Sequence, residues 1–409
     1  MRRSTLVAAS LLGVGGAALW GTVAVRAVER IQNPPEVVAV NAHVVKPEQV
    51  PSTEEMVRQL KLPAGFRITK FAESLENPRM LAVADDGTVY VTQRKPGNLV
   101  QLRDTNGDGK ADSKNIVAQQ PGMHGIAIRG NSMWLATVKE VFTAERNADG
   151  SVGSLKRIVD NLPDGGQHPN RTLAFGPDGY LFVSVGSTCN ACTETNPESA
   201  TILRMRPDGS ERKIYASGLR NTIGFGWHPT SRRMYGMDHG IDWLGDTEQK
   251  EELNEIKNDV RYGWPFVYAD GKFNPADSPE ELGYTYEQWA KMSHEPVQLY
   301  TAHSAPMQMV FYTGTQFPAE YRNNAFVAMR GSWNRKPPSG YEVVRIRFDE
   351  QGNAQSIEPF ITGFLQEQEG DNWRHFGRLA GMAMAKDGSL LLTDDTNGVM
   401  YRIAYTGNQ

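Results

Sequence analysis

Short runs of alternating apolar and polar residues recur along most of the chain, and each follows a tight polar turn. A period of two predicts β-strands with one buried face, and Asp-Gly or Asn-Asn pairs favour the turns before them. The clearest runs are DDGTVYVTQR from Asp85, GNSMWLATVK from Gly130, GPDGYLFVSVGS from Gly176, SRRMYGMDHG from Ser231, NNAFVAMRGS from Asn323 and KDGSLLLTDD from Lys386. Their spacing of roughly forty to ninety residues predicts a repeated sheet unit.

Several of these runs follow an apolar segment that is rich in small residues. These segments read NPRMLAV, MHGIAI, RTLAFG, TIGFGWHP and LAGMAMAKDG. Small residues suit strands that approach a central axis closely, so the repeat predicts an all-β, six-bladed β-propeller over residues 52–409. A pair of β-sandwiches and a large barrel are the alternatives, and both predict the recurrence less directly.

The N-terminus is separate from this pattern. Arg2 and Arg3 precede an uncharged run, Leu6–Val25, which Arg26 ends. Residues 1–32 are therefore predicted to be a Sec-type signal peptide or a single uncleaved membrane anchor, and the sequence favours neither. Residues 33–51 are predicted to be a linker. We expect a periplasmic or secreted protein, anchored to the inner membrane if the segment is not cleaved.

Composition narrows the classes of partner. Forty glycines and 23 prolines supply turns without the bias of a disordered chain. The 43 basic and 47 acidic side chains give a net charge of −4, which argues against a nucleic-acid partner.

The chain has two cysteines, Cys189 and Cys192. In an exported protein this pair predicts a disulfide that closes a small loop, while a redox pair and half of a zinc site remain alternatives. Thr193 follows Cys192, so the histidine needed for attachment of a c-type haem is missing. Electrons from any redox reaction must leave to an external acceptor.

The densest candidate chemistry lies between Gly218 and Pro265, which contains GLRNTIGFGWHP, YGMDHGID, EELNEI and YGWP. Arg220 offers a planar fork for a carboxylate, and Asn221 adds a neutral donor and acceptor. The turn that ends at Gly240 leaves backbone carbonyls free to face a hard cation. This combination predicts a pocket for an anionic cofactor assisted by a metal ion.

His168 lies in DGGQHPNRTLAFGPDG, just before an apolar strand. A neutral imidazole there could accept a hydroxyl proton near physiological pH, and a structurally bonded histidine is the alternative. Arg171, three residues further on, either binds a ligand or anchors the loop.

The order of these motifs resembles the soluble pyrroloquinoline quinone (PQQ)-dependent sugar dehydrogenases, and more closely their sorbosone dehydrogenase-like branch. His168 stands ahead of RTLAFGPDGYLFVSVGS, and GLRN, DHG with EELN, and YGWP follow. The likeness runs from Leu62 to Tyr405 and includes HSAPMQMVFYTG, GSWNR and GRLAGMAMAKDGSLLLTDDTNG.

The resemblance implies a six-bladed propeller with the quinone near its axis. His168 would be the base that removes the substrate hydroxyl proton, and Arg220 with Asn221 would hold the cofactor. The backbone carbonyls of Gly240 and Ile241 match the turn that binds a Ca²⁺ ion in the family. That ion would polarise the quinone oxygen that gains charge.

Arg330 in AMRGSWNR and Arg378 in FGRLAG are the other expected cofactor ligands, because inward-facing arginines in the last third would converge on the same anion. The chain departs from the family near the base. Members often have acids where this sequence has Gln167 and Ser187, so the group that orients the imidazole is open, with Asp164 a candidate substitute.

The sequence thus predicts a PQQ-dependent oxidoreductase that acts on a sugar or sugar aldehyde of the aldose or sorbosone type. Its expected partners are that small substrate and an external electron acceptor, either a quinone or a cytochrome. A lactonase-like metal-dependent hydrolase would need several inward carboxylates, and a non-catalytic propeller would need none of the proposed site.

Overall fold

The computed structural model describes residues 40–370 and 372–407. The predicted signal or anchor segment lies outside the described residues. Helices are few in the described part, with α1 at Glu54–Arg58, α2 at Tyr286–Met292 and the 3-10 turns η1 at Pro279–Leu282 and η2 at Ala319–Tyr321. Among these residues, none of the helices has the length and apolar character needed to cross a membrane. The all-β prediction is confirmed.

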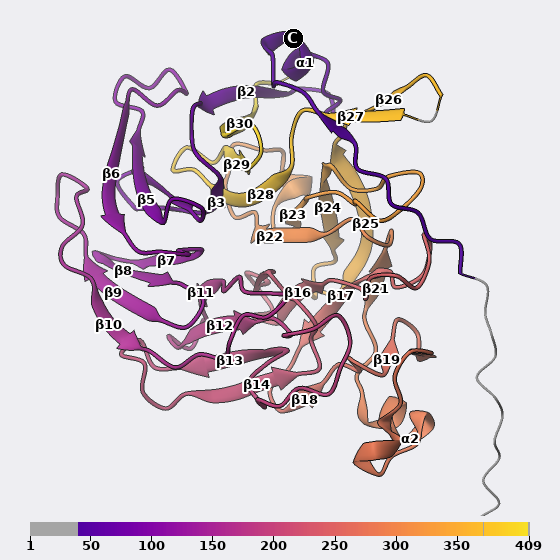
Figure 1. Cartoon of the computed structure of the whole chain (residues 1–409). Coiled ribbons are helices and arrows are strands. Elements are labelled where there is room, and N and C mark those ends of the chain that lie inside the picture. Colours follow the sequence, from indigo (N-terminus) through magenta and orange to yellow (C-terminus); the bar gives the residue numbers. More distant parts are fainter. Residues whose placement is uncertain (1–39, 371, 408–409) are drawn as a thin grey trace, which may run out of the picture. The chain divides into compact units, whose positions relative to one another are not determined.

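Six sheets of four or five strands dominate residues 40–407, and they succeed one another around a common centre (Figure 1). From inner to outer strand, the first three contain β3 (Pro78–Val83), β4 (Val89–Gln93), β5 (Asn98–Arg103) and β6 (Ser113–Gln119); β7 (Gly125–Arg129), β8 (Ser132–Ala136), β9 (Val141–Glu145) and β10 (Lys156–Val159); β11 (Leu173–Phe175), β12 (Leu181–Val185), β13 (Thr201–Met205), β14 (Lys213–Ser217) and β18 (Val260–Arg261).

The next three contain β15 (Gly224–Trp227), β16 (Met234–Asp238), β17 (Glu251–Ile256) and β21 (Gln298–Tyr300); β22 (Pro306–Phe311), β23 (Ala325–Met329), β24 (Glu342–Phe348) and β25 (Ala354–Ile361); β28 (Leu379–Met384), β29 (Leu390–Asp394), β30 (Val399–Tyr405) and β2 (Phe66–Ala72). Smaller sheets are formed by β1 (Glu48–Gln49), β27 (Asn372–His375) and β26 (Leu365–Gln368), and by β19 (Val267–Tyr268) and β20 (Lys272–Phe273).

The six alternating runs of the sequence are the second strands of these six sheets, β4, β8, β12, β16, β23 and β29. All five residues are buried in each of these strands, except for Ser132 at the start of β8. The small-residue segments before them form innermost strands, as expected.

The innermost strands of neighbouring sheets approach so closely that a side chain would not fit between them. A Cβ atom on Gly224 would lie 1.9 Å from the carbonyl oxygen of Met307 in the next sheet. A Cβ on Gly381 would lie 2.0 Å from the Arg79 carbonyl, and one on Gly125 would lie 2.6 Å from the Arg171 carbonyl. Glycine is thus required where backbone meets backbone.

The last sheet joins the two ends of the sheet domain, because its outer strand β2 precedes the other five sheets in sequence and its inner three strands are C-terminal. Phe66 of β2 pairs with Tyr405 of β30 and packs edge-on against Phe317 and Phe360. This pairing ties the start of the domain to its end.

The described part of the predicted linker also contacts the domain. Val45 N donates to Trp333 O at 3.1 Å, and Val50 N donates to His375 O at 2.9 Å. The His43 backbone N–H bonds the Asp246 carboxylate at 3.0 Å. These hydrogen bonds hold the segment around residues 43–50 against the sheet domain.

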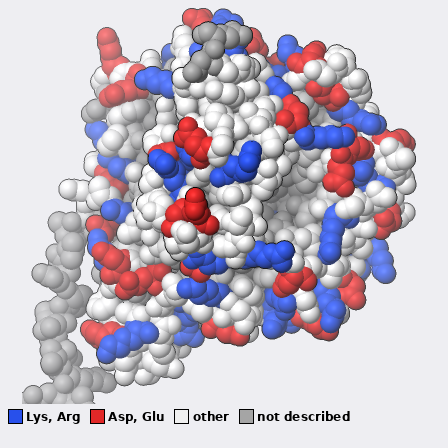
Figure 2. All heavy atoms as spheres, turned by 180° about the vertical axis from the view of Figure 1, so that it is seen from behind, with Lys and Arg blue, Asp and Glu red and all other residues white. Residues whose placement is uncertain are grey.

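The surface and the insertion agree with the composition. Figure 2 shows acidic and basic side chains interspersed over the face that it displays. The polar insertion that contains α2 projects beside β19 (Figure 1). It is fixed by Trp289, which packs edge-on against Phe266 and donates to Gly263 O at 2.8 Å.

Gly224→Ala is expected to lower the free energy of unfolding by about 1–3 kcal/mol, because the added Cβ would force two packed strands apart. Gly226→Ala in the same strand is the matched control, since its Cβ would lie 3.4 Å from Phe311, an ordinary contact. We expect less than about 0.5 kcal/mol there. Urea unfolding measures both, and equal losses would contradict the close-approach account.

Acid is expected to destabilise the protein through His124, which is buried beside Arg79. Burial first, and then the positive Arg79, hold the pKa of His124 well below its usual value. As pH falls below about 6.5, the unfolded chain takes up a proton that the folded chain cannot bind, so stability is lost. His124→Gln should make this decline shallower by up to about 1.4 kcal/mol per pH unit. Urea unfolding at successive pH values tests this, and identical slopes would refute it.

Candidate active site

A cavity of about 330 Å³ lies where loops from several sheets converge. It brings together six of the predicted site residues, namely His168, Arg220, Asn221, Gly240, Arg330 and Arg378. The seventh, Ile241, is not part of the lining. Its side chain is buried in a small apolar cluster with Ala200 and Trp264.

His168 presents one defined tautomer to this cavity. Its Nδ1 lies 3.0 Å from the Ser187 carbonyl oxygen and 2.9 Å from Ser187 Oγ. A carbonyl can only accept, so Nδ1 carries the proton and Nε2 is left with its lone pair. Burial first, and then the positive Arg220, lower the pKa of His168 to about 2. The imidazole is therefore neutral at physiological pH.

The group that orients His168 is Ser187 and not an acid. The suggestion of Asp164 is wrong, because its largely exposed side chain pairs with Lys139 at 3.2 Å. Proximity in sequence does not bring that carboxylate to the ring. Gln167, the other departure from the family pattern, bonds Asp242 at 3.3 Å.

Arg171 anchors the loop that carries His168. Its guanidinium is fully buried and donates to the backbone oxygens of Val138, His168 and Pro163 at 3.1, 2.9 and 2.9 Å. Of the two roles open from sequence, the structure supports the anchoring one.

Asp238, at the end of β16, holds the segment that carries Arg220 and Asn221. Its carboxylate accepts the Arg220 and Asn221 backbone N–H groups at 2.7 and 2.8 Å and the Thr222 hydroxyl at 2.8 Å. Burial raises the pKa of Asp238 to about 6 despite these bonds. The Asp238 carboxylate is thus buried, and it fixes the backbone at Arg220 and Asn221.

The Arg220 side chain is buried and partly neutralised. Its Nη2 lies 3.1 Å from Asp242 Oδ2, and its Nε donates to Asn190 O at 2.9 Å. These contacts use Nε and Nη2. Within the described part of the chain, Nη1 is the nitrogen of this guanidinium left for a ligand.

Arg330 and Arg378 form a strongly cationic part of the lining. Asp395 Oδ2 is shared by Arg330 and the buried Arg79, and these two cations hold the pKa of Asp395 low although burial would raise it. Burial first, and then the positive Arg330, lower the pKa of Arg378 to about 10. Positive charge therefore exceeds negative charge here.

Acidic oxygens lie near Gly240. The buried Glu251 carboxylate accepts the Gly240 and Ala305 backbone N–H groups at 3.0 and 2.8 Å, and burial raises its pKa to about 8. Asp242 receives Asn334 Nδ2 at 2.8 Å. A Cβ on Gly240 would lie 2.0 Å from the Gln249 carbonyl, so the turn requires glycine.

Two more histidines and a tryptophan complete the wall. His239 and His303 line the cavity and donate from Nε2 to the carbonyls of Pro306 and Gly245 at 2.5 and 2.8 Å. Trp333 also lines the cavity. It packs edge-on against the half-exposed Trp243, with 5.0 Å between the ring centroids. Their hydrogen bonds make the histidines structural members of the wall.

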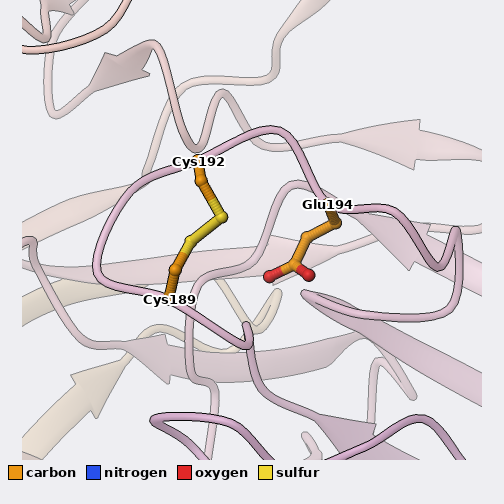
Figure 3. Close-up of side chains that lie close together, drawn as sticks. All are labelled: Cys189, Cys192 and Glu194. Atoms are coloured by element: carbon orange, nitrogen blue, oxygen red, sulfur yellow. A yellow bond between two sulfur atoms is a disulfide. The ribbon is translucent and has the colours of Figure 1, made fainter.

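Cys189 and Cys192 form a disulfide, the first of the three alternatives. Figure 3 shows the disulfide across its loop, with the Glu194 side chain directed toward it. The Glu194 carboxylate receives the Thr188 backbone N–H at 2.6 Å and the Thr188 hydroxyl at 2.7 Å. Because both sulfurs are oxidised, this group lacks the thiolates of a zinc site.

Several residues of the site were not predicted. Asp395 and Glu251 stand in the quoted strings TDDT and EELN, yet their roles depend on partners far along the chain. One signal was available beside Asp395, since β29 ends at Asp394 as β16 ends at Asp238. Asn334 and Asn190 had no such signal.

Two relatives match most of the length of this chain. An uncharacterized protein of Borreliella burgdorferi is 29% identical over 371 residues, which cover 87% of this chain and 93% of that protein. A pyrroloquinoline quinone-dependent pyranose dehydrogenase of Coprinopsis cinerea is 22% identical over 84% of this chain. The match spans 54% of that longer protein.

The fold also matches solved structures. The holo form of the pyranose dehydrogenase PQQ domain from Coprinopsis cinerea superposes with a TM-score of 0.71 at 20% identity, and covers 88% of this chain and 100% of that domain. The PQQ-bound aldose sugar dehydrogenase of Streptomyces coelicolor gives 0.59 at 20% identity, over 84% of this chain and 100% of that one.

The profile of the glucose/sorbosone dehydrogenase family matches residues 75–402, which contain all seven predicted site residues. The chain belongs to the glucose/sorbosone dehydrogenase family.

Proposed function

We propose that this protein is a PQQ-dependent dehydrogenase that oxidises a sugar or sugar aldehyde, with Ca²⁺ bound beside the quinone. One observation carries the proposal: Arg220, Arg330 and Arg378 line the same cavity as a neutral, oriented His168. The family and the PQQ-bound relatives support it. The six sheets would be the blades of a six-bladed propeller, with the cavity at one end of its axis.

The cavity fits an anion that carries several carboxylates. Arg220 keeps Nη1 available for a ligand. The positive charges of Arg330 and Arg378 repel one another. A bound carboxylate relieves that repulsion and forms charge-assisted hydrogen bonds. Asn221 supplies a neutral polar group in the same lining. These four residues are the proposed cofactor ligands.

The turn at Gly240 fits a hard cation. The proposed ligands are the backbone carbonyls of Gly240 and Ile241, since carbonyl oxygens suit Ca²⁺. Ile241 can take part only through its backbone, because its side chain is buried away from the cavity. The nearby carboxylate of Asp242 adds negative charge that favours the ion.

His168 would act as the general base. Nδ1 is fixed by Ser187, so Nε2 is the atom that accepts the proton of the substrate hydroxyl. When bound, the quinone supplies the acceptor for the hydride that leaves the same substrate carbon. Burial first, and then the positive Arg220, keep His168 unprotonated.

We propose export to the periplasm or secretion, with residues 1–32 acting as a signal or an inner-membrane anchor. The electrons would pass to an external quinone or cytochrome. The disulfide fits an oxidising compartment.

Purified protein is expected to bind PQQ in the presence of Ca²⁺ at micromolar or lower concentration and then to reduce a dye when aldoses are added. His168→Gln should bind PQQ as the parent does but lose about 10²–10⁴-fold in kcat, because the proton acceptor is gone. His294→Gln, outside the cavity, is the control. Absorbance titration and dye reduction measure both steps. A parent protein that binds no PQQ would exclude the proposal.

Arg378→Met is expected to weaken PQQ binding by about 10–100-fold, because one charge-assisted hydrogen bond is lost from a buried site. Arg322→Met provides the control, since Arg322 is exposed and lies outside the cavity. Titration of each apo-protein with PQQ and Ca²⁺ gives the affinities. Equal affinities for the two variants would remove Arg378 from the cofactor site.

A further inference from the structure

The loop closed by the Cys189–Cys192 disulfide contacts three parts of the site. These are Ser187, which holds the base His168, the proposed cation-binding turn at residues 240–242 (the cation turn), and Arg220. The residue at its centre is Asn190, to which neither the motifs nor the family resemblance assigned a role. Asn190 takes part in five hydrogen bonds with three residues, Arg220, Asp242 and Trp264. Its side chain and its backbone are both used.

Arg220 is held by Asn190 in a single orientation. Nε donates to the Asn190 carbonyl at 2.9 Å, and Nη2 donates to Asn190 Oδ1 at 2.8 Å. Two acceptors from one residue fix the plane of the guanidinium, as a bidentate carboxylate would, without adding a negative charge. These two bonds leave Nη1 for a ligand, while Asp242 offsets part of the charge.

The cation turn is held by the same side chain. Asp242 N donates to Asn190 Oδ1 at 2.9 Å, and Asn190 Nδ2 donates to Asp242 O at 3.1 Å. This reciprocal pair fixes the backbone one residue after Ile241. Trp264 Nε1 also donates to Asn190 O at 3.2 Å.

The base is tied to the same loop at Cys189. Ser187 Oγ donates to the Cys189 carbonyl at 2.6 Å, which leaves its lone pairs to receive His168 Nδ1–H. The carbonyls of two consecutive residues, Cys189 and Asn190, therefore support the base and the anion-binding arginine. The disulfide restricts the backbone between them.

We propose that the disulfide loop is a positioning element for the active site, with Asn190 as the positioning residue that sets Arg220 and the Asp242 turn. The inference rests on the proposed function for its ligand. It assigns separate tasks to neighbouring residues. Asn190 sets cofactor affinity, Ser187 sets the protonation behaviour of His168, and the disulfide supports both.

The first test is titration of the parent and of Asn190→Ala with PQQ in the presence of Ca²⁺. We expect Asn190→Ala to bind at least about tenfold more weakly, because the Arg220 fork and the Asp242 turn lose their shared partner. Asn196→Ala is the matched control, since Asn196 is exposed, follows in the same connection and bonds only local backbone at Glu198 and Ser199. It should bind as the parent does.

Two further variants separate positioning from general destabilisation. Ser187→Ala should keep its affinity for PQQ but change the pH dependence of kcat, because Nδ1 loses its hydroxyl partner. The double variant Cys189→Ser/Cys192→Ser should weaken PQQ binding as Asn190→Ala does. Thermal melting of each apo-protein shows which variants are folded. If Asn190→Ala is unfolded, parent-like affinity in the double variant overturns the proposal.

A ligand-free measurement separates this inference from the proposed function. Hydrogen exchange followed by mass spectrometry should show faster exchange at the Asp242 amide in Asn190→Ala than in Asn196→Ala, because that amide donates to Asn190 Oδ1. A parent that binds no PQQ would refute the proposed function alone. Unchanged exchange at Asp242, or a folded Asn190→Ala with parent affinity, would refute the role of Asn190.

Discussion

The close approach of innermost strands at the centre of the sheet ring is the constraint on which the rest of the structure depends. At Gly224 and Gly381 the backbone of one sheet lies against a carbonyl of the next, with no room for a Cβ. Such contacts bring the ends of all the sheets within reach of a common centre. Beyond the strand ends the loops converge on the cavity.

The repeat then decides which side chains reach that centre. A basic residue stands in or within four residues before each of the six innermost strands, as Arg79, His124, Arg171, Arg220, His303 and Arg378. Each has a different partner. Arg171 holds loop carbonyls, His124 is buried beside Arg79, and Arg220 and Arg378 face the cavity. An acid at the end of the second strand fixes the backbone of two of the three cavity arginines, Asp238 at Arg220 and Asp394 at Arg378.

Local sequence patterns were enough to predict most of the strands that form the six sheets. All six second strands and five of the six innermost strands were read from alternation and small residues. β22, in HSAPMQMVF, was missed as a repeat, although its register shift between Pro306 and Met309 recurs in β3 and β28. Six of seven site residues meet in one cavity because each lies in a loop that adjoins an innermost or a second strand. The supports of the site, Ser187, Asn190 and Asp395, act through partners that no local pattern reveals.

The electrostatics of the cavity connect these parts. Burial and Arg220 together lower the pKa of His168, so the positive charge that suits an anionic cofactor also keeps the base free of its proton. A carboxylate bound at Arg220 would offset that charge and raise the basicity of His168. The base would then be weakest in the empty site and stronger once the cofactor is in place. Since Ser187 and Asn190 are neutral, they orient His168 and Arg220 without disturbing this balance.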